Sequence, residues 1–491
     1  MISKKFIKSS FIYTVIGALP LASATILLPF YTNLLTTSQF GILALYIAFT
    51  AVVQILVNYA LENYLIVHYI ENINDKQFLK NIIGTVVILL LAIGLLCTIL
   101  LLIFGNKLFN LYSSVTENKT ILEFFPYGIM AVATAVFNSF FKTYTNLLIA
   151  QQRPNKFFWM NIINFILTIS ISLTGLYMFP QTLKGPMWGR LLSGAGIFLM
   201  ALFFFIREFG IGFQSKLVKD MIKYCSPLLL FFILFWIIGN IDRYIIGYFL
   251  PTEKIGIFDF AIKCTLLLEF FQNGLGGAIN PKIYHIWRES KIPANTMEIN
   301  RYYNSFTLIT MICLPLFVIV IPYLIPLIVK NRDYFISFSF LSILAMGYTI
   351  NGLKTMYTNP VMYFKKTRIL PRVYIYSAIF QVVATIFAVK YMGLMGAVWV
   401  NFLIKILQVF FLYLETRKTF TLEFNHVKLL YLPLFFCFIT CVFYFAIKLF
   451  SLNYLVWCFH MLIVYASVYF VFRKELKLLL KDFNFRSLVK F

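Results

Sequence analysis

Residues 82–104 have the sequence IIGTVVILLLAIGLLCTILLLIF, a run of 23 residues without a charged side chain. A helix of about 20 apolar residues is long enough to cross the hydrocarbon core of a bilayer. This stretch therefore predicts a membrane-spanning helix, and the same pattern recurs along the chain. We predict fourteen spans, near residues 11–32, 41–61, 82–104, 121–148, 157–179, 186–206, 222–250, 257–284, 304–329, 335–358, 370–389, 394–414, 427–450 and 453–472.

The composition of the chain agrees with a membrane environment. Hydrophobic residues make up 61% of the 491 residues, and charged residues make up only 12%. Soluble proteins contain roughly 45–50% apolar residues even when glycine is counted, and they carry their charges on the surface. A soluble fold is therefore excluded, and the chain is predicted to be an all-α polytopic membrane protein.

The basic residues alternate between the two sides of the predicted membrane. With the N-terminus in the cytoplasm, the inner segments hold 28 Lys and Arg residues and the outer loops hold eight. Cytoplasmic loops carry such an excess, so we expect both termini in the cytoplasm and an even number of spans. The formal net charge of +24 then serves contact with the anionic inner leaflet, and it does not indicate nucleic-acid binding.

The start of the chain and its cysteines suggest no further feature. Lys4, Lys5 and Lys8 precede an apolar run that continues past Pro20 and Pro29 without a small-residue cleavage site, so we expect a retained first span rather than a signal peptide. All seven cysteines fall in apolar segments without CxxC spacing. Buried cysteines of this kind behave as small hydrophobic residues, and we expect no disulfide, metal or cofactor.

Three features recur along the chain at nearly constant spacing. The segment 34–42, LLTTSQFGI, has a counterpart 215 residues later in 249–257, FLPTEKIGI. The other two matched pairs are Arg153 with Arg368, at the same offset, and Trp188 with Trp399, at an offset of 211. Each match joins span n to span n + 6, although apolar segments also share short motifs by chance.

An even repeat of six spans predicts two lobes with the same orientation in the membrane. Such lobes are related by a pseudo-twofold axis along the membrane normal, one of the repeat classes found in transporters. The predicted lobes are residues 1–210 and 211–418. Residues 419–491 add spans 13 and 14 and a cytoplasmic tail.

Several motifs carry a more specific resemblance. The segment 242–250, DRYIIGYFL, followed by Gly256-Ile257-Phe258 and Lys263, resembles the mid-chain signature of bacterial polysaccharide flippases. The same family is indicated by three shorter motifs, which are Leu28-Pro29, Gln39-Phe40-Gly41 and Gly393-Leu394-Met395-Gly396-Ala397. These flippases belong to the multidrug/oligosaccharidyl-lipid/polysaccharide (MOP) exporter superfamily.

This resemblance implies two six-helix lobes around a central cavity that opens alternately to the two sides of the membrane. It also implies a cargo, a polyprenyl-diphosphate-linked oligosaccharide that moves from the inner to the outer leaflet of the bacterial cytoplasmic (inner) membrane. The product would be a cell-surface polysaccharide of the O-antigen (lipopolysaccharide) or capsule type. The expected partners are the lipid-linked oligosaccharide, membrane lipids and polysaccharide polymerase machinery, without nucleic acid.

Charged side chains within spans are costly and mark functional sites. We predict that six basic residues form a cationic cavity for the diphosphate, because Arg and Lys bind phosphate oxygens through charge-assisted hydrogen bonds. They are Arg243, Lys405, Lys263, Arg190, Lys142 and Lys354. For Lys142, Arg190 and Lys354, which lie nearer to helix ends, the alternative is that the side chain reaches out to the lipid head groups.

Three acidic residues within spans are predicted to couple ions or to pair with these cations. Asp259 and Lys263 have the i,i+4 spacing of a helical ion pair, so a structural salt bridge is the alternative to an ion site. Asp242 and Arg243 are neighbours in sequence and must each find a partner on another helix. Glu269 is the third candidate. Donors for sugar hydroxyls are predicted among the carboxamides within spans, which are Asn58, Asn138, Asn146, Asn161, Asn164, Asn240, Asn273 and Gln381, although interhelical hydrogen bonding explains them equally well.

Two other functions remain open. A multidrug exporter of the same superfamily uses a carboxylate in its first lobe, whereas the predicted cores of spans 1, 2, 3, 5 and 6 contain no Asp or Glu. A membrane polysaccharide polymerase or ligase has a long outer loop with Arg and acidic residues, but the longest outer loop here, 105–120, carries only Lys107, Glu117 and Lys119. We therefore expect a transporter and no enzyme.

Overall fold

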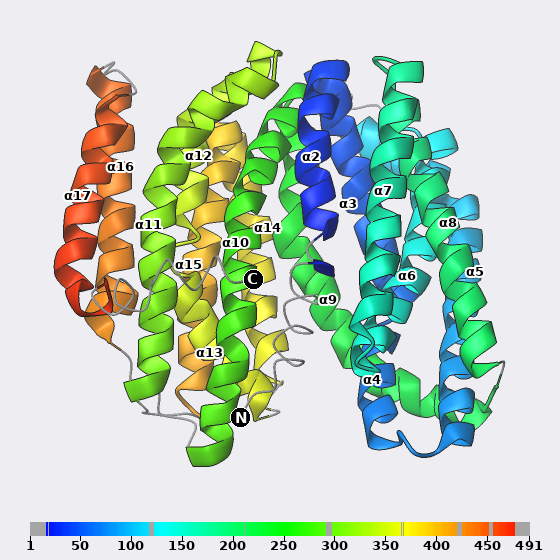
Figure 1. The fold of residues 1–491 in the computed structure, drawn as a ribbon. Helices are drawn as coiled ribbons and strands as arrows, with labels where there is room; N and C mark the ends of the chain where they lie inside the picture. Colours follow the sequence, from blue (N-terminus) through cyan, green and yellow to red (C-terminus); the bar gives the residue numbers. More distant parts are fainter. Residues whose placement is uncertain are drawn as a thin grey trace. The chain divides into compact units, whose positions relative to one another are not determined.

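The computed structural model describes residues 16–476, apart from positions 18, 211, 365 and 367 and the segments 117–121, 291–296, 420–424 and 451–454. These residues form helices and no strand, as expected for an all-α protein (Figure 1). The predicted cytoplasmic termini, including Lys4, Lys5 and Lys8, lie outside the described residues.

Among the described residues, ten helices are long and apolar enough to cross a membrane. They are α3 (Thr37–Asn58), α5 (Lys76–Val115), α6 (Ile129–Ala150) with the preceding turn η1 (Phe124–Gly128), α7 (Pro154–Met178), α8 (Lys184–Phe209), α9 (Ser215–Phe249), α11 (Met297–Ile328), α14 (Ile369–Met392), α15 (Leu394–Thr416), and α16 (Leu432–Phe450) with the turn η3 (Val427–Tyr431).

An eleventh crossing consists of a pair of helices bent by 45°, where η2 (Arg332–Ser337) and α12 (Phe338–Met346) meet α13 (Asn351–Tyr363). Three further predicted spans also coincide with helices. α2 (Leu19–Leu34) and α17 (Val456–Val471) are 16 residues long, and α10 (Thr252–Ser290) carries five charged residues in its first 18 positions. Length and composition thus support ten or eleven of the fourteen predicted crossings, and the protein is a multi-pass membrane protein.

Local sequence explains where several of these helices begin and end. α3 begins with a capping box in which the Thr36 side chain accepts from the Gln39 backbone and the Gln39 side chain accepts from the Thr36 backbone. It ends where Tyr59 and Ala60 both adopt left-handed backbone angles, with φ of 49° and 58°. The chain then restarts as α4 (Leu61–Glu71), so the predicted second span is broken near its inner end.

The chain divides into two compact units. The first contains Met1–Lys263, Val329–Tyr334 and Gln381–Ala397. Its helices α7 and α8 lie side by side (Figure 1), and their closest approach is at Gly175 and Gly185. A Cβ atom on Gly185 would meet the backbone of Gly175 and Leu176 at 2.5 Å, so the two helices pack at this distance only because both positions lack a side chain.

A second close contact in this unit joins the starts of α3 and α10. A Cβ atom on Gly41 would collide with the backbone oxygen of Thr252, and one on Gly256 would collide with the backbone oxygen of Thr37. Gly41 and Gly256 lie 215 residues apart, which is the offset of the predicted repeat, and so do Thr37 and Thr252. The contact is therefore reciprocal between repeat-related residues.

The second unit contains Cys264–Ile328, Phe335–Phe380 and Val398–Phe491. Within it α16 packs against α17 and α12, and α11 packs against α12, α13 and α17. The predicted lobes, 1–210, 211–418 and 419–491, follow the sequence repeat rather than compactness, and they stay a prediction.

Candidate functional site

A cavity of about 570 Å³ lies among five helices of the first unit, α2, α3, α6, α7 and α8. Its lining combines hydroxyl and carboxamide side chains with a few apolar residues. The polar lining residues are Ser23, Gln54, Thr134, Asn138, Lys142, Thr145, Asn146, Asn161, Asn164, Thr168, Arg190 and Ser193. A polar cavity inside a membrane-spanning bundle is a functional-site candidate, because lipid-facing surfaces cannot satisfy so many hydrogen-bonding groups.

Two of the six predicted basic residues, Lys142 and Arg190, line this cavity, and none of the acidic residues in the described ranges does so. Four of the predicted carboxamides also line it, namely Asn138, Asn146, Asn161 and Asn164. The lining side chains therefore present positive charge and amide groups, which suits an anionic ligand that also carries hydroxyl groups.

Arg190 lies in the second turn of α8. Among the described residues, no carboxylate comes within ion-pair distance of its guanidinium. Asn161 lies on the neighbouring helix α7, where its amide nitrogen donates to the Phe157 carbonyl at 2.8 Å. An Arg without a carboxylate partner keeps its donors available for a ligand that can accept two hydrogen bonds.

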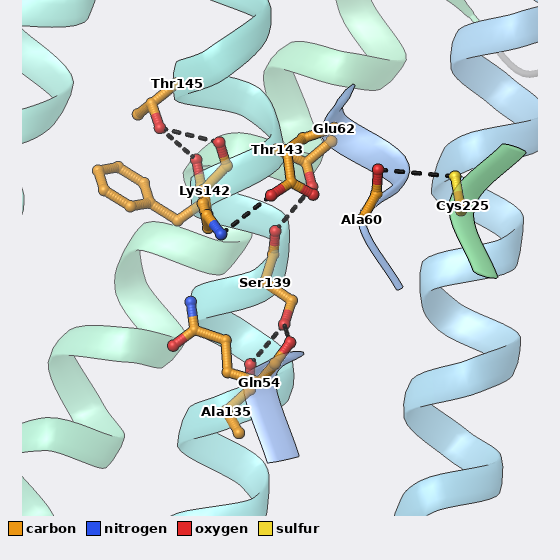
Figure 2. A network of polar contacts seen from close by, with 10 residues as sticks. Gln54, Ala60, Glu62, Ala135, Ser139, Lys142, Thr143, Thr145 and Cys225 are labelled. Carbon is orange, nitrogen blue, oxygen red and sulfur yellow. Dashed lines mark hydrogen bonds and ion pairs between the residues drawn. The ribbon is translucent and has the colours of Figure 1, made fainter. Parts of the chain in front are cut away.

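Lys142, on α6, is paired with an acidic residue behind the cavity wall. Its Nζ lies 2.9 Å from Oε1 of Glu62 on α4 (Figure 2). The Lys142 side chain is 43% exposed, whereas the Glu62 side chain is only 4% exposed. The cavity therefore reaches the ammonium group but not its carboxylate.

The hydroxyl groups of α6 near this pair are used within the helix. Thr143 donates to the carbonyl of Ser139 at 2.9 Å, and Ser139 donates to that of Ala135 at 2.8 Å (Figure 2). Ser139 also lies 3.3 Å from the carbonyl oxygen of Gln54 on α3. The contact of Ser139 with the Gln54 backbone joins α6 to α3, while Gln54 also lines the cavity.

Arg243 and Lys263 occupy a different place in the first unit, on either side of Asp259. Arg243 Nε and Lys263 Nζ lie 2.7 Å and 2.8 Å from the two Asp259 carboxylate oxygens. Lys263 also lies 4.3 Å above the ring of Phe40. All three charged groups are almost fully buried, so the i,i+4 pair expected from the sequence forms and is extended by Arg243 from α9.

Asp242 finds its partners on α14. The amide of Gln381 and the hydroxyl of Thr385 both donate to Asp242 Oδ1, the latter at 3.2 Å. All three side chains are almost completely buried. As expected from their adjacent positions, Asp242 and Arg243 contact different helices.

The remaining predicted residues lie in the second unit. Lys405, on α15, places its Nζ 4.2 Å above the ring of Tyr348, and its side chain fills the space beside Gly347. Lys354 and Glu269 are half-buried, on α13 and α10. Nearby polar groups bond to one another, with Gln272 joining Tyr348 and Asn351.

Glu62 is the residue that the sequence analysis missed. Glu62 falls one position beyond the predicted second span. The helix breaks at Tyr59 and Ala60, and at the start of the new helix α4 Glu62 is only 3% exposed. A buried carboxylate does therefore exist in the first half of the chain. The absence of such a carboxylate no longer counts against a multidrug exporter. Because Glu62 is paired with Lys142, the lining itself remains cationic.

A second cavity in the first unit, of about 390 Å³, has an apolar lining contributed by α3, α5, α9 and Leu122. The polar tips of its aromatic residues all bond to backbone oxygens. Tyr112 donates to Tyr244, Trp236 to Ala48, Tyr244 to Leu45 and Tyr46 to Glu123. The cavity therefore offers hydrocarbon surface and few free polar groups. The described part of the chain contains no group of three or more His, Cys, Asp and Glu residues that could hold a metal ion.

The chain was compared with protein families and with solved structures. The family model "Polysaccharide biosynthesis protein" matches residues 31–331. No curated protein matches the sequence.

Several solved structures share the fold. The lipid II flippase MurJ in its inward closed conformation matches with a TM-score of 0.74 at 13% identity, over 94% of this chain and 99% of that one. An inward-facing multidrug resistance MATE family transporter of the MOP superfamily matches with a TM-score of 0.58 at 15% identity, over 85% and 96% of the two chains. A MOP superfamily transporter from Pyrococcus furiosus matches with a TM-score of 0.51 at 14% identity, over 84% and 95%. These matches confirm the predicted all-helical fold of the MOP exporters.

Proposed function

Because the chain belongs to this family of polysaccharide biosynthesis proteins, we propose that it flips a polyprenyl-diphosphate-linked oligosaccharide across the bacterial cytoplasmic membrane. Transport proceeds by alternating access and supplies a cell-surface polysaccharide of the O-antigen or capsule type. The proposal is supported by the fold shared with a lipid II flippase, whose name describes the transport of a lipid-linked cargo.

One observation carries the proposal: the polar cavity of the first unit is lined by Arg190 and Lys142 and, among the residues that the structure describes, by no acidic residue. A diphosphate in a low-dielectric bundle must be matched by cations, because an unpaired buried charge is strongly disfavoured. Arg190 supplies a fork of donors for two phosphate oxygens. Lys142 adds a second, more mobile charge.

The carboxamides of the same cavity are proposed to bind the sugar. Asn138, Asn146 and Asn164 are half-buried and lie on α6 and α7, together with Gln54 on α3. Each amide both donates and accepts, as sugar hydroxyls do. The polyprenyl chain remains in the bilayer while the polar head group moves through the protein.

The other predicted cations have secondary roles in this proposal. Arg243 and Lys263 contact the head group only after Asp259 releases them, since it holds both. Lys405 and Lys354 are the proposed diphosphate-binding residues of the second unit. Asp242, Asp259 and Glu269 are proposed carriers of a coupling proton or sodium ion. If transport and its ion dependence survive neutralisation of each of the three, this part of the proposal is wrong.

The proposed setting follows from the charge pattern of the loops. Both termini lie in the cytoplasm, and the protein works with membrane lipids and with the polymerase that consumes the flipped unit. It performs no chemistry on the cargo. The alternative function is drug export, for which the buried carboxylate Glu62 is the one favourable observation.

The test compares two ligands with purified protein in detergent. A short-chain polyprenyl diphosphate and a cationic dye are titrated into the wild type, Arg190→Ala, Arg243→Ala and Lys405→Ala. A hydrogen bond to a charged group contributes about 1.5–3 kcal/mol, so Arg190→Ala is expected to weaken diphosphate binding by roughly 10–100-fold. Arg190→Lys, which keeps the charge but loses the fork, should recover part of that loss.

Dye binding with no preference for diphosphate would move the protein to the drug-export branch. Thermal stability is measured for each variant, so that a loss of fold is not mistaken for a loss of binding. Arg372→Ala is the matched control, because the Arg372 side chain is 64% exposed beside Glu415 and does not line the cavity.

A further inference from the structure

We propose that Glu62 and Lys142 form an exchangeable charge pair: an anionic head group in the cavity takes the Lys142 ammonium, and a monovalent cation then takes its place at Glu62. The inference rests on the proposed function, since it requires an anionic cargo. It adds a site for a coupling cation that lies apart from Asp242, Asp259 and Glu269.

The first step is that the two ends of the pair are unequally accessible. Lys142 is among the residues that line the cavity, and Glu62 is not. The Lys142 ammonium on α6 and the Glu62 carboxylate on α4 lie 2.9 Å apart (Figure 2). A ligand in the cavity can therefore reach one partner of the pair without reaching the other.

The second step is that the Lys142 side chain can move away from Glu62 into the cavity, whereas the Glu62 side chain cannot move with it. Apart from Glu62, the contact of the Lys142 ammonium is with the ring of Phe232, whose centre is 5.5 Å away. Its long side chain has four rotatable bonds to swing into the cavity. Glu62 is the second residue of α4, directly after the left-handed residues Tyr59 and Ala60, and its shorter side chain is 4% exposed.

The third step is that, in the part of the chain that the structure describes, Glu62 has no second basic partner. α4 packs against α5, α6 and α9, and among the described residues Lys142 is the one basic group within ion-pair distance of Glu62. On α9, Cys225 donates to the Ala60 carbonyl, and Tyr224 packs against Tyr64 and His68. His68 stacks on Tyr64 one and a half turns further along α4, with Nδ1 at the Tyr64 carbonyl. Asp220 and Glu71 add only negative charge.

The fourth step is that the carboxylate has unused capacity. Glu62 Oε2 is buried and has no hydrogen-bond partner. Asn58, four residues earlier and on the other side of the helix break, is 2% exposed, and neither polar atom of its side chain has a partner. Carboxylate and amide oxygens are the ligands that hard cations take, and broken helices are where transporters bind coupling ions.

These steps together make cargo and cation dependent on each other. Taking away one partner of a buried ion pair leaves an uncompensated charge, which is strongly destabilising. Lys142 can therefore serve the diphosphate only if a proton or a sodium ion neutralises Glu62 at the same time. By linkage, the cation must tighten cargo binding as much as the cargo tightens cation binding.

The experiment measures binding of a short-chain polyprenyl diphosphate to the full-length protein in detergent. The titration is repeated from about pH 8 to about pH 6, and at constant ionic strength with sodium or choline as the cation. In the wild type we expect affinity to rise by about tenfold or more with falling pH or with sodium, a usual size for coupling between two sites. The arm that responds identifies the cation.

The decisive variant is Glu62→Gln, which has the same shape and needs no counter-ion. It is expected to bind the diphosphate tightly under every condition and to lose the dependence on the cation. Glu208→Gln is the matched control, because Glu208 pairs with Arg153 and Lys156 away from the cavity lining. Titration of the ligand itself is common to all three proteins and cancels in the comparison.

A second variant tests the site without cargo. In Lys142→Gln the buried Glu62 has permanently lost its ammonium, so we expect the thermal midpoint to rise with sodium or with falling pH more steeply than in the wild type. This readout also covers the case in which Glu62→Gln does not fold. Equal dependence in Lys142→Gln and the wild type would overturn the proposal.

The outcomes separate this inference from the proposed function. If Glu62→Gln binds diphosphate with the same cation dependence as the wild type, the exchange is wrong and the flippase proposal stands. If the wild type shows no preference for diphosphate over a cationic dye, both are wrong.

Discussion

Two of the charged residues within the first unit differ sharply in what surrounds them. Arg190 faces a cavity without a carboxylate, whereas Asp259 is enclosed between Arg243 and Lys263. Arg190 keeps its hydrogen-bonding capacity for a ligand. The hydrogen-bonding capacity of Asp259 is already used by Arg243 and Lys263. Removing the Asp259 charge should therefore lower the stability of the protein.

Asp259→Asn is expected to lower the free energy of unfolding by about 3–5 kcal/mol, because it leaves two buried cations without their shared counter-ion. The thermal midpoint in detergent measures this loss. Lys418→Gln is the control: Lys418 is 63% exposed where it pairs with Glu415, and an exposed pair contributes only about 0–1 kcal/mol.

Replacing all three charges with apolar residues, as in Arg243→Met with Asp259→Leu and Lys263→Met, should recover most of that stability. An Asp259→Asn protein as stable as the wild type would mean that the three groups do not depend on one another.

At this scale the sequence predicted the residue types but not all of their partners. The i,i+4 spacing was enough for Asp259 and Lys263. The contacts of Arg243 with Asp259 and of Asp242 with Gln381 depend on how helices are rotated against one another, and a single sequence carries no signal for that rotation. Glu62 was missed because the turn that buries it contains Tyr59 and Ala60, which are not turn-forming residues.

Among the elements, apolar length predicted the helices well and their interruptions poorly. Each predicted span coincides with a helix or a bent pair of helices. The break after α3, at Tyr59 and Ala60, lacks the Gly or Pro signal that marks most helix ends, whereas the break between α12 and α13 begins at Gly347. The close contacts between helices lie at glycines, such as Gly41, Gly185 and Gly256. Glycines can be located in a sequence, but the sequence alone does not say which helix each one meets.

The contact of α7 with α8 at Gly175 and Gly185 gives the second prediction. Gly185→Ala is expected to destabilise the protein by about 1–3 kcal/mol, since overpacking forces the backbones apart. Gly239→Ala is the matched control: Gly239 is also helical and in the same unit, but a Cβ atom there meets nothing within 4 Å. It should be neutral or stabilising by up to about 1 kcal/mol, because Ala is the better helix former.

The thermal midpoints of Gly185→Ala and Gly239→Ala, measured side by side in detergent, test this prediction. If Gly185→Ala were as stable as Gly239→Ala, the two helices would not depend on this approach.

For the whole molecule, the loop charges predict which side of the membrane each connection faces. In a variant without its native cysteines, a single cysteine at Lys107 or Lys184 should react with a membrane-impermeant maleimide in intact cells. One at Arg153 or Lys216 should react only after the membrane is opened. The physical reason is the excess of Lys and Arg in cytoplasmic loops.

The labelling pattern also tests the number of spans. If both loops of an adjacent pair, such as Arg153 and Lys184, were labelled from the same side, the span between them would not cross. An outward-facing Lys216 would reverse the orientation of everything that follows it.

The reciprocal contact at the starts of α3 and α10 concerns the origin of the chain. Thr37 and Gly41 meet Gly256 and Thr252 in the same way from both sides, which is how a surface patch meets its own copy across the axis of a symmetric dimer. Such a contact is what gene duplication and fusion leave behind when the ancestor was a homodimer of six-helix chains. Neither glycine could then acquire a side chain while both copies were encoded by one gene, and each is still held in place by the other.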